Sequence, residues 1–259
     1  LFEKIVNDFI NNDPNFNERA NKGVISHMGL GSIALLLEDQ TLFNRAYGPD
    51  NPSSGDEPSY IWAIKHGYTA GVGVDGIWLE PTQFYHSYTM RHVIPFALAV
   101  KHSRTSGIND AFITSPSLKD IFISYLGVAY PNLYINPTGD SHWSRDINSD
   151  AADVFNTIYP NSDEFEYVLL NVNGPSPSVR GLWRMAWNLV YMNDYGSPGA
   201  YKPLSNVYGS FGILRYGNAM DQLYGFIDFA NNNPNHDHRD KLATYFAGFG
   251  KIPVTSVVR

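Results

Sequence analysis

The sequence of 259 residues contains no cysteine, which excludes disulfide bonds, thiolate metal sites and cysteine nucleophiles. It also contains no apolar run near the roughly 18 residues that a membrane-spanning helix needs, so we expect no span. Basic residues are in the minority, with 18 Lys and Arg against 25 Asp and Glu and a net charge of −7. Without a basic block, duplex nucleic acid is not an expected partner.

Several motifs of well-known enzymes are also missing. The sequence has no Gly-x-Gly-x-x-Gly, no phosphate-binding Walker loop, no Gly-x-Ser-x-Gly and no His-Glu-x-x-His. Nucleotide binding, serine hydrolase chemistry and zinc peptidase chemistry are therefore not favoured.

Aromatic residues, in contrast, are abundant: 17 Tyr, 15 Phe and 5 Trp make up 14% of the chain. Many tyrosines stand among polar residues and glycines. Because tyrosine combines an apolar face with a hydroxyl group, this pattern suits a sugar-binding cleft. Tyrosines that fill wide interfaces between helices and sheets would give the same composition.

The apolar pattern predicts an α+β protein, with helices first and strands later. The helices are predicted over 28–47, 59–70, 88–102, 117–130, 147–159, 164–172 and 180–193. Gly48-Pro49 should end the first, and Pro95 should kink the third or mark its first turn. Short strand-like runs follow at 207–216, 223–230, 241–249 and 252–258. The break near 196–203 predicts a boundary between a helical domain, 1–200, and a β-domain, 201–259. The chain starts without methionine and ends in a strand-like run, so we expect a fragment or a processed chain.

Polar clusters mark the candidate sites. His236 and His238 alternate along a predicted strand and would share one face, which suits a metal or an imidazole in a cleft, although a solvated charged loop is equally compatible. His27 lies near the start of an apolar helix and could be catalytic or a buried structural residue. Asn21 has the alternative role of a helix cap.

Two further segments join these clusters. The stretch from Asp75 to Tyr88 places two carboxylates, a histidine and two tyrosines between predicted helices. Loops of this kind often carry catalytic groups. Asp140, in a Gly-Asp turn, could bind sugar hydroxyls or orient a histidine, although stabilising the turn is its commoner role.

Taken in order, four segments resemble the heparinase II/III-like group of polysaccharide lyases, which includes related oligoalginate lyases. The segments are Asn21–Leu37, Asp75–Tyr88, Pro137–Ser141 and Asn235–Gly250. The resemblance implies an incomplete α/α toroid of helical hairpins followed by an antiparallel, β-sandwich-type sheet. It implies β-elimination on a 4-linked uronic-acid polysaccharide, with 4,5-unsaturated ends as products.

The resemblance also implies catalytic roles. Asn21 and His236 would neutralise the uronate carboxylate, because hydrogen-bond donors aimed at it stabilise the enolate-like transition state. His27 and Tyr85 would be the base and acid pair. If the C5 proton and O4 are syn, Tyr85 could serve both roles; if they are anti, His27 would be the base and Tyr85 the acid.

Substrate contacts and partners follow from the same resemblance. The candidate substrate-binding residues are Glu80, Tyr88, Arg91, Arg239 and Lys241. No cofactor is required. Some members carry a structural zinc, for which His238 is the candidate ligand, but the expected downstream aspartate is missing. The expected partner is an acidic polysaccharide or oligosaccharide, and this substrate class implies secretion or a periplasmic location.

Three other interpretations stay open. The chain could be an (α/α)-barrel glycoside hydrolase that uses Asp75 and Glu80 as its carboxylate pair. It could belong to the hyaluronate and chondroitin lyases, which share an Asn-rich helix and an Asp-Gly loop. It could also be a carbohydrate-binding protein without catalytic activity.

Overall fold

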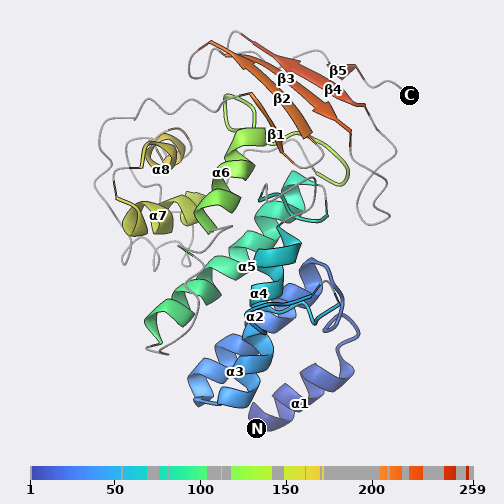
Figure 1. Cartoon of the computed structure of the whole chain (residues 1–259), viewed down its shortest axis with the longest axis vertical. Helices are drawn as coiled ribbons and strands as arrows, with labels where there is room; N and C mark the ends of the chain where they lie inside the picture. The colour runs from blue at the N-terminus through green and yellow to red at the C-terminus, as the bar shows by residue number, and fades with distance from the viewer. Residues whose placement is uncertain are drawn as a thin grey trace.

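The computed structural model of the chain describes residues 2–53, 55–68, 76–80, 82–103, 112, 118–141, 149–160, 162–169, 171, 205–208, 211–217, 222–229, 242–248 and 255–256. Helices fill the first part and an antiparallel sheet the last, which confirms the predicted order of helices before strands. Figure 1 shows the sheet at one end of the molecule and α1 at the other. The helices are α1 (Phe2–Asn12), α2 (Asn21–Leu37), α3 (Gln40–Tyr47), α4 (Tyr60–Trp62), α5 (Gln83–His102), α6 (Leu118–Val128), α7 (Ser149–Ile158) and α8 (Asp163–Val168).

The first predicted helix, 28–47, is wrong as a single element, because α2 and α3 are separate helices. Glu38 adopts a left-handed conformation with φ of 55° and ends α2. Asp39 then caps α3 by accepting hydrogen bonds from the backbone N–H groups of Thr41 (2.9 Å) and Leu42 (3.1 Å). The apolar run at the end of α2 continues the helical pattern and hides this break. Gly48, with φ of 86°, ends α3 as predicted.

The second predicted helix, 59–70, is a short α-helical turn that widens into a π-helical turn over Ala63–Gly67. Ser59 caps it, with its hydroxyl accepting from the Trp62 N–H at 3.3 Å. A side chain at Gly67 would collide with the ring of Trp78, so glycine allows the indole to pack against this turn.

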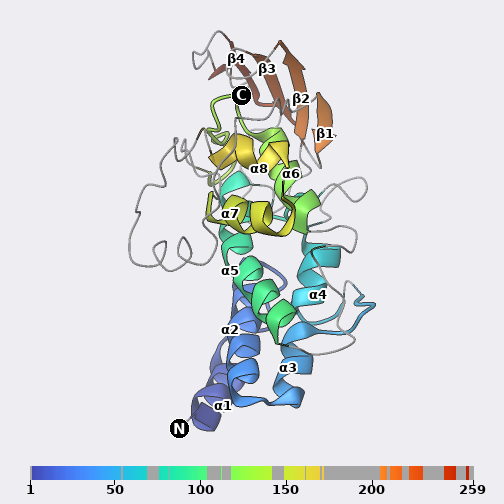
Figure 2. The same cartoon turned by 90° about the vertical axis from the view of Figure 1, so that its left-hand side faces the viewer.

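Helix α5 starts at Gln83, five residues before the predicted start at 88, because Thr82 caps it through a hydrogen bond from the Tyr85 N–H (3.2 Å). Pro95 lies inside the helix rather than in its first turn. Helices α5 and α2 pack side by side, as Figure 2 shows. Their neighbouring pairs, Asn21 with Glu80 and Gly31 with Phe96, show that they run parallel from a shared end.

The remaining helices close the core through aromatic contacts. Phe122 of α6 and Phe155 of α7 have ring centroids 5.4 Å apart, and both contact Phe165 of α8 at 5.5 and 5.2 Å. All three rings are fully buried. These helices match the predictions at 117–130, 147–159 and 164–172 within a few residues, with α8 ending at Val168, four residues before the predicted end. The helix predicted over 180–193 lies outside the described residues.

In the described part of the chain, five antiparallel strands form one sheet in sequence order. They are β1 (Asn206–Tyr208), β2 (Phe211–Tyr216), β3 (Leu223–Asp228), β4 (Thr244–Ala247) and β5 (Thr255–Ser256). The strand predicted over 207–216 is thus two strands, β1 and β2, paired Val207 to Gly212. The domain boundary predicted near 200 falls among residues that are not described and stays a prediction.

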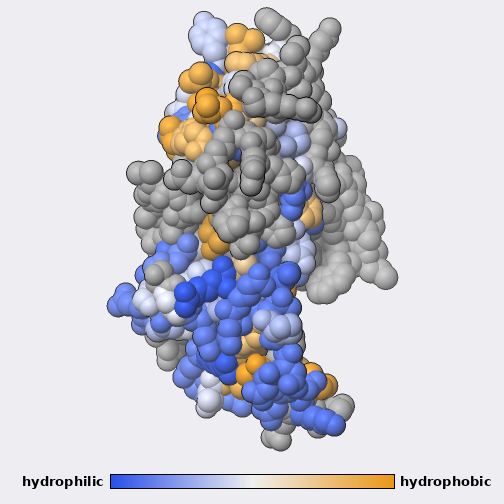
Figure 3. Space-filling model, turned by 90° about the vertical axis from the view of Figure 1, so that its right-hand side faces the viewer, coloured by the Kyte–Doolittle hydropathy of each residue, from blue (hydrophilic) through white to orange (hydrophobic). Residues whose placement is uncertain are grey.

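Alternation along the strands gives the sheet two faces. The face toward the helices buries Phe211, Ile213, Tyr224, Phe226 and Tyr245. The opposite face exposes large apolar side chains, among them Leu214 and Phe246. Figure 3 shows apolar groups at the sheet end and a more hydrophilic described surface over the helices.

One carbonyl group joins the sheet to the helices. The Val128 carbonyl, at the end of α6, accepts hydrogen bonds from the Tyr224 hydroxyl of β3 (2.7 Å) and the Asn136 side chain (3.0 Å). Gln83, the first residue of α5, also donates to it at 3.4 Å and accepts from the Asn136 N–H at 2.8 Å. We call Gln83, Val128, Asn136 and Tyr224 the junction. It fixes the start of α5 relative to the sheet.

Arg215 of β2 strengthens the same contact. Its Nη2 donates to the carbonyls of Gly127 (2.8 Å) and Ala129, which lie at the carboxyl end of α6, where a positive charge is favourable. Its guanidinium also lies 4.8 Å from the centroid of the Tyr224 ring.

In the described part of the chain, none of the helices is long and apolar enough to cross a membrane.

Candidate functional site

Two chain segments that are far apart in the sequence meet at the shared start of α2 and α5. The Glu80 carboxylate is buried and accepts hydrogen bonds through Oε2 from the Asn21 N–H (3.0 Å) and the Trp78 indole (2.7 Å). Ala20, the residue before α2, makes no capping hydrogen bond with its side chain. Glu80, although 59 positions away in the sequence, therefore caps the amino-terminal end of α2, and its negative charge suits the positive end of the helix dipole.

This contact holds Asn21 in a fixed place. Its side chain is almost completely buried, and its amide makes no hydrogen bond to another described residue. An amide in this position can donate to an oxygen anion that enters the site. Asn21 and Glu80, both predicted site residues, are thus brought together: Glu80 binds the start of α2 through the Asn21 N–H and is itself held by the Trp78 indole.

Tyr85 stands in the first turn of α5, beside the same cluster. The Ser141 hydroxyl accepts from the Phe84 N–H at 3.0 Å, which ties the predicted Gly-Asp turn to this helix start. Burial raises the pKa of Tyr85 above its usual value of 10, and the nearby carboxylates of Asp140 and Glu80 raise it further. The half-buried phenol consequently keeps its proton at neutral pH and can act as a proton donor.

Tyr88 and Arg91 extend the site along α5. The rings of Tyr85 and Tyr88 meet edge to face, with centroids 6.4 Å apart, and Tyr88 is 37% exposed. Arg91 is exposed one turn further along the helix. Both predicted substrate-binding residues are thus accessible on the helix that carries Tyr85.

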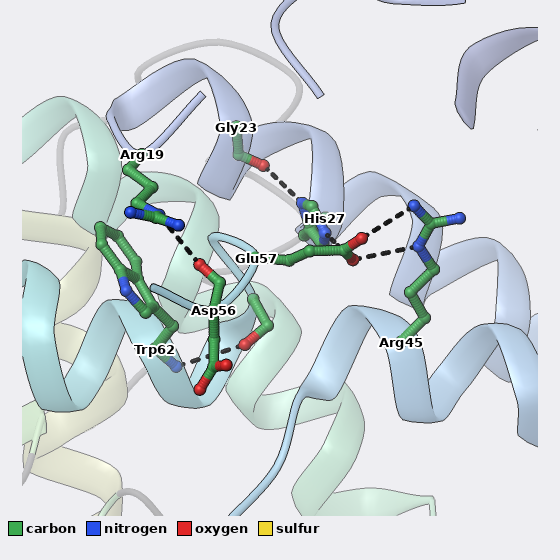
Figure 4. Close-up of polar contacts among 8 residues, drawn as sticks. Arg19, Gly23, His27, Arg45, Asp56, Glu57 and Trp62 are labelled. Atoms are coloured by element: carbon green, nitrogen blue, oxygen red, sulfur yellow. Dashed lines mark hydrogen bonds and ion pairs between the residues drawn. The ribbon is translucent and has the colours of Figure 1, made fainter. Parts of the chain in front are cut away.

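His27 lies in a different environment, which Figure 4 shows. Its ring is fully buried and stacks on Phe16, with centroids 4.2 Å apart. Nδ1 donates to the Gly23 carbonyl (2.9 Å), and Nε2 lies 3.4 Å from Oε2 of Glu57. Arg45 in turn holds Glu57 through two hydrogen bonds, at 3.0 and 3.1 Å.

Burial is the largest influence on the pKa of His27. Burial lowers its pKa below the usual 6.5, although the hydrogen bonds with Gly23 and Glu57 oppose that effect. Both ring nitrogens face protein groups, and the ring has no exposed surface. This geometry favours a structural role of His27 in holding α2, which was one of its two sequence-based interpretations.

The other predicted site residues lie outside the described residues. They are Asp75, His236, His238, Arg239 and Lys241. Within the described ranges, no group of three or more His, Asp and Glu side chains could hold a metal ion. The zinc prediction that rests on His238 stays untested.

Sequence reasoning missed the partners that hold the site. Glu57 and Arg45 belong to an ion pair around His27, and Trp78 and Ser141 orient Glu80 and α5. They are separated in sequence from the groups that they contact, except for Trp78, so local pattern gave no signal. The burial of His86, next to Tyr85, was also missed, and this burial lowers the pKa of His86 to about 3. Its position on the buried side of α5 was the sequence signal for it.

No protein-family model and no curated protein matches this sequence. Solved structures do match. A heparinase III with methylated lysines gives a TM-score of 0.62 at 12% identity, over 97% of this chain and 34% of that chain. A heparan sulfate lyase from Pedobacter heparinus gives 0.59 at 10% identity, over 97% and 34%. A further heparinase III structure gives 0.63 at 14% identity, over 97% and 36%.

These matches show that the fold of the chain is similar to part of the fold of the heparinase III structures. This likeness agrees with the sequence resemblance to the heparinase group. The chain spans about a third of the length of these structures. At 10 to 14% identity, the likeness concerns the fold.

Proposed function

We propose that the chain is part of a polysaccharide lyase that cleaves a 4-linked uronic-acid polysaccharide by β-elimination and leaves 4,5-unsaturated ends. The observation that carries this proposal is the cluster of Asn21, Glu80, Tyr85 and Asp140 at the shared start of α2 and α5. Asn21 and Tyr85 both lie beside the Glu80 carboxylate, and the fold is similar to part of the fold of heparinase III, which supports the proposal.

In the proposed reaction, the Asn21 amide donates to the uronate carboxylate. This interaction stabilises the negative charge that develops when the C5 proton leaves. Tyr85 gives its proton to O4 as the bond to the leaving sugar breaks. Its raised pKa suits this role, because the phenol stays protonated until the transition state. His236 would assist Asn21.

Two routes supply the base at C5. In the syn route Tyr85 takes the C5 proton as a phenolate and then returns a proton to O4. In the anti route His27 is the base. The full burial of His27 favours the syn route, whereas the raised pKa of Tyr85 makes the phenolate scarce at neutral pH. The pH dependence of the reaction separates the two routes.

The helices would form part of an α/α toroid, and the sheet would form part of a β-sandwich. Heparan sulfate is the first polymer to test, because the structural neighbours include a heparan sulfate lyase. Alginate stays a second candidate. A secreted or periplasmic location would follow from such a substrate.

The test is ultraviolet absorbance of unsaturated uronate, measured with heparan sulfate, alginate, hyaluronan, chondroitin and ulvan. Wild-type protein should produce absorbance with at least one polymer, and Tyr85→Phe should lower the rate by about 10²- to 10⁴-fold. Tyr216→Phe, at a tyrosine of β2 that is 79% exposed, is the matched control and should keep the wild-type rate. Full activity of Tyr85→Phe would refute the proposed role.

A hydrolase is less well supported by the geometry. Glu80 is buried and engaged with Asn21 and Trp78, so it is not placed as a free glycosidase carboxylate. New reducing ends without absorbance would nevertheless identify a hydrolase. Polymer binding without either product would identify a carbohydrate-binding protein.

A further inference from the structure

A groove of about 530 Å³ lies between α2 and α5. This volume falls within the range of sites that bind small molecules in proteins, roughly 300 to 1,000 Å³. One side of each helix lines the groove. The lining residues are Ile25, Met28, Gly29 and Ser32 of α2, and Arg91, His92, Pro95 and Phe96 of α5.

The groove lies further along α2 and α5 than the candidate site. Because α2 and α5 run parallel from the end that holds Asn21 and Tyr85, the space between them leads away from that end. A row of ring contacts follows the same path on α5. Tyr85 contacts Tyr88 at 6.4 Å between centroids, and Tyr88 contacts His92 of the groove wall at 5.3 Å. His92 lies seven positions after Tyr85, a rise of about 10 Å along the helix, which is roughly the length of a disaccharide.

We propose that this groove is a subsite for an acidic sugar residue, about one disaccharide away from the bond that is cleaved beside Tyr85. The inference rests on the proposed function, because the sugar residue in the α2–α5 groove would belong to the same polysaccharide that is cleaved beside Tyr85.

The chemistry of the walls fits such a residue. Arg91 can recognise a carboxylate or a sulfate group through paired hydrogen bonds. Burial and the charge of Arg91 lower the pKa of His92, so His92 is neutral at pH 7 and the charge in the groove comes from Arg91. The apolar side chains of Ile25 and Pro95 offer surface to the C–H face of a sugar ring.

Gly29 gives a sharp test, because it lines the groove and a Cβ atom built on it meets no atom within 4 Å. Gly29→Phe should therefore fill the groove without disturbing the packing of α2. Phenylalanine also has a higher helix propensity than glycine, so the variant should keep its thermal stability. Leu36→Phe is the matched control, because Leu36 lies on the same helix, is 73% exposed and does not line the groove.

The assay compares kcat/KM for heparan sulfate polymer with kcat/KM for the shortest oligosaccharide that is cleaved. Gly29→Phe should lower the ratio of these two values about tenfold, whereas Leu36→Phe should leave it unchanged. A wild-type ratio in Gly29→Phe, together with active enzyme, would overturn the subsite and leave the proposed lyase standing.

Equilibrium binding of a heparan sulfate hexasaccharide separates the two proposals. If wild-type protein makes no unsaturated product but binds the hexasaccharide, and Gly29→Phe weakens binding about tenfold, the groove stands and the elimination fails. If wild-type protein neither cleaves nor binds, both proposals fail.

Arg91→Ala identifies the acidic group. Weaker binding of both unsulfated heparosan and heparan sulfate would support a carboxylate contact. Weaker binding of heparan sulfate alone would support a sulfate contact. Unchanged binding of both oligosaccharides would contradict the role of Arg91 and overturn the acidic-sugar subsite.

Discussion

The buried His86 ring should make the protein sensitive to acid. The ring is 1% exposed, stacks on Tyr125 with centroids 4.7 Å apart, and accepts a hydrogen bond at Nδ1 from the Trp78 N–H (3.2 Å). Burial lowers its pKa from 6.5 to about 3. The folded state therefore needs the neutral ring, while the unfolded chain binds a proton below pH 6.5.

The sign and size of the effect follow from this difference. Between pH 6.5 and about pH 3, the unfolded state holds one more proton at this position than the folded state, so the free energy of unfolding decreases as the pH falls. The loss is about 1.4 kcal/mol per pH unit. From pH 6.0 to pH 4.5, His86 alone should remove about 2 kcal/mol of stability.

Urea unfolding at several pH values, followed by tryptophan fluorescence, measures this loss. His86→Asn is the reference variant, because asparagine can accept from the Trp78 N–H and does not titrate. The variant should be less stable than wild type at pH 7, and the gap should shrink by about 2 kcal/mol between pH 6.0 and pH 4.5. Parallel stability curves for the two proteins would refute the reasoning.

Further predictions concern the junction, the glycines and the pH profile. Arg215→Met removes the charged hydrogen bonds to Gly127 and Ala129 and should lower the free energy of unfolding by about 2 to 3 kcal/mol; an unchanged urea midpoint would contradict this. Gly67→Ala should lower the melting temperature, because the added methyl group would collide with the Trp78 ring. Gly29→Ala should raise the melting temperature, because its methyl group meets no atom and alanine has the higher helix propensity. Shifts of the same sign for both variants in calorimetry would contradict this packing. If Tyr85 is only the acid, kcat/KM should fall above pH 10; if it is also the base, kcat/KM should rise toward that pH. Either limb should vanish in Tyr85→Phe.

The sequence predicted much of the secondary structure, because each element is amphipathic over its own length. It missed the break between α2 and α3, since the leucines before Glu38 continue the apolar pattern. Asp39, followed by a polar-apolar turn, was the signal for a new helix start. The split of 207–216 into β1 and β2 did have a sequence signal, because Gly209 and Ser210 interrupt the apolar residues on either side.

The candidate site was predictable in its residue types but not in its contacts. Asn21 and Glu80 are 59 positions apart, and only the packing of α2 against α5 brings them together. His27 carried two interpretations because its sequence neighbours do not reveal Glu57, which is 30 positions away. Burial and long-range partners decide the role of such groups, and neither is encoded in local spacing.

The junction at the Val128 carbonyl has a consequence for how a polymer reaches Tyr85. The sheet contributes one donor to this oxygen, the Tyr224 hydroxyl, which also accepts from the Asn136 side chain at 2.8 Å. Lifting the sheet from the helices would break these two buried hydrogen bonds, whereas Gln83 and Asn136 would stay bound to the carbonyl. Gln83 lies two residues before Tyr85 and is held by the Val128 carbonyl and the Asn136 N–H, so the junction also fixes the start of the helix that carries the phenol. We therefore expect the proposed lyase to admit its polymer without a movement of the sheet away from the helices.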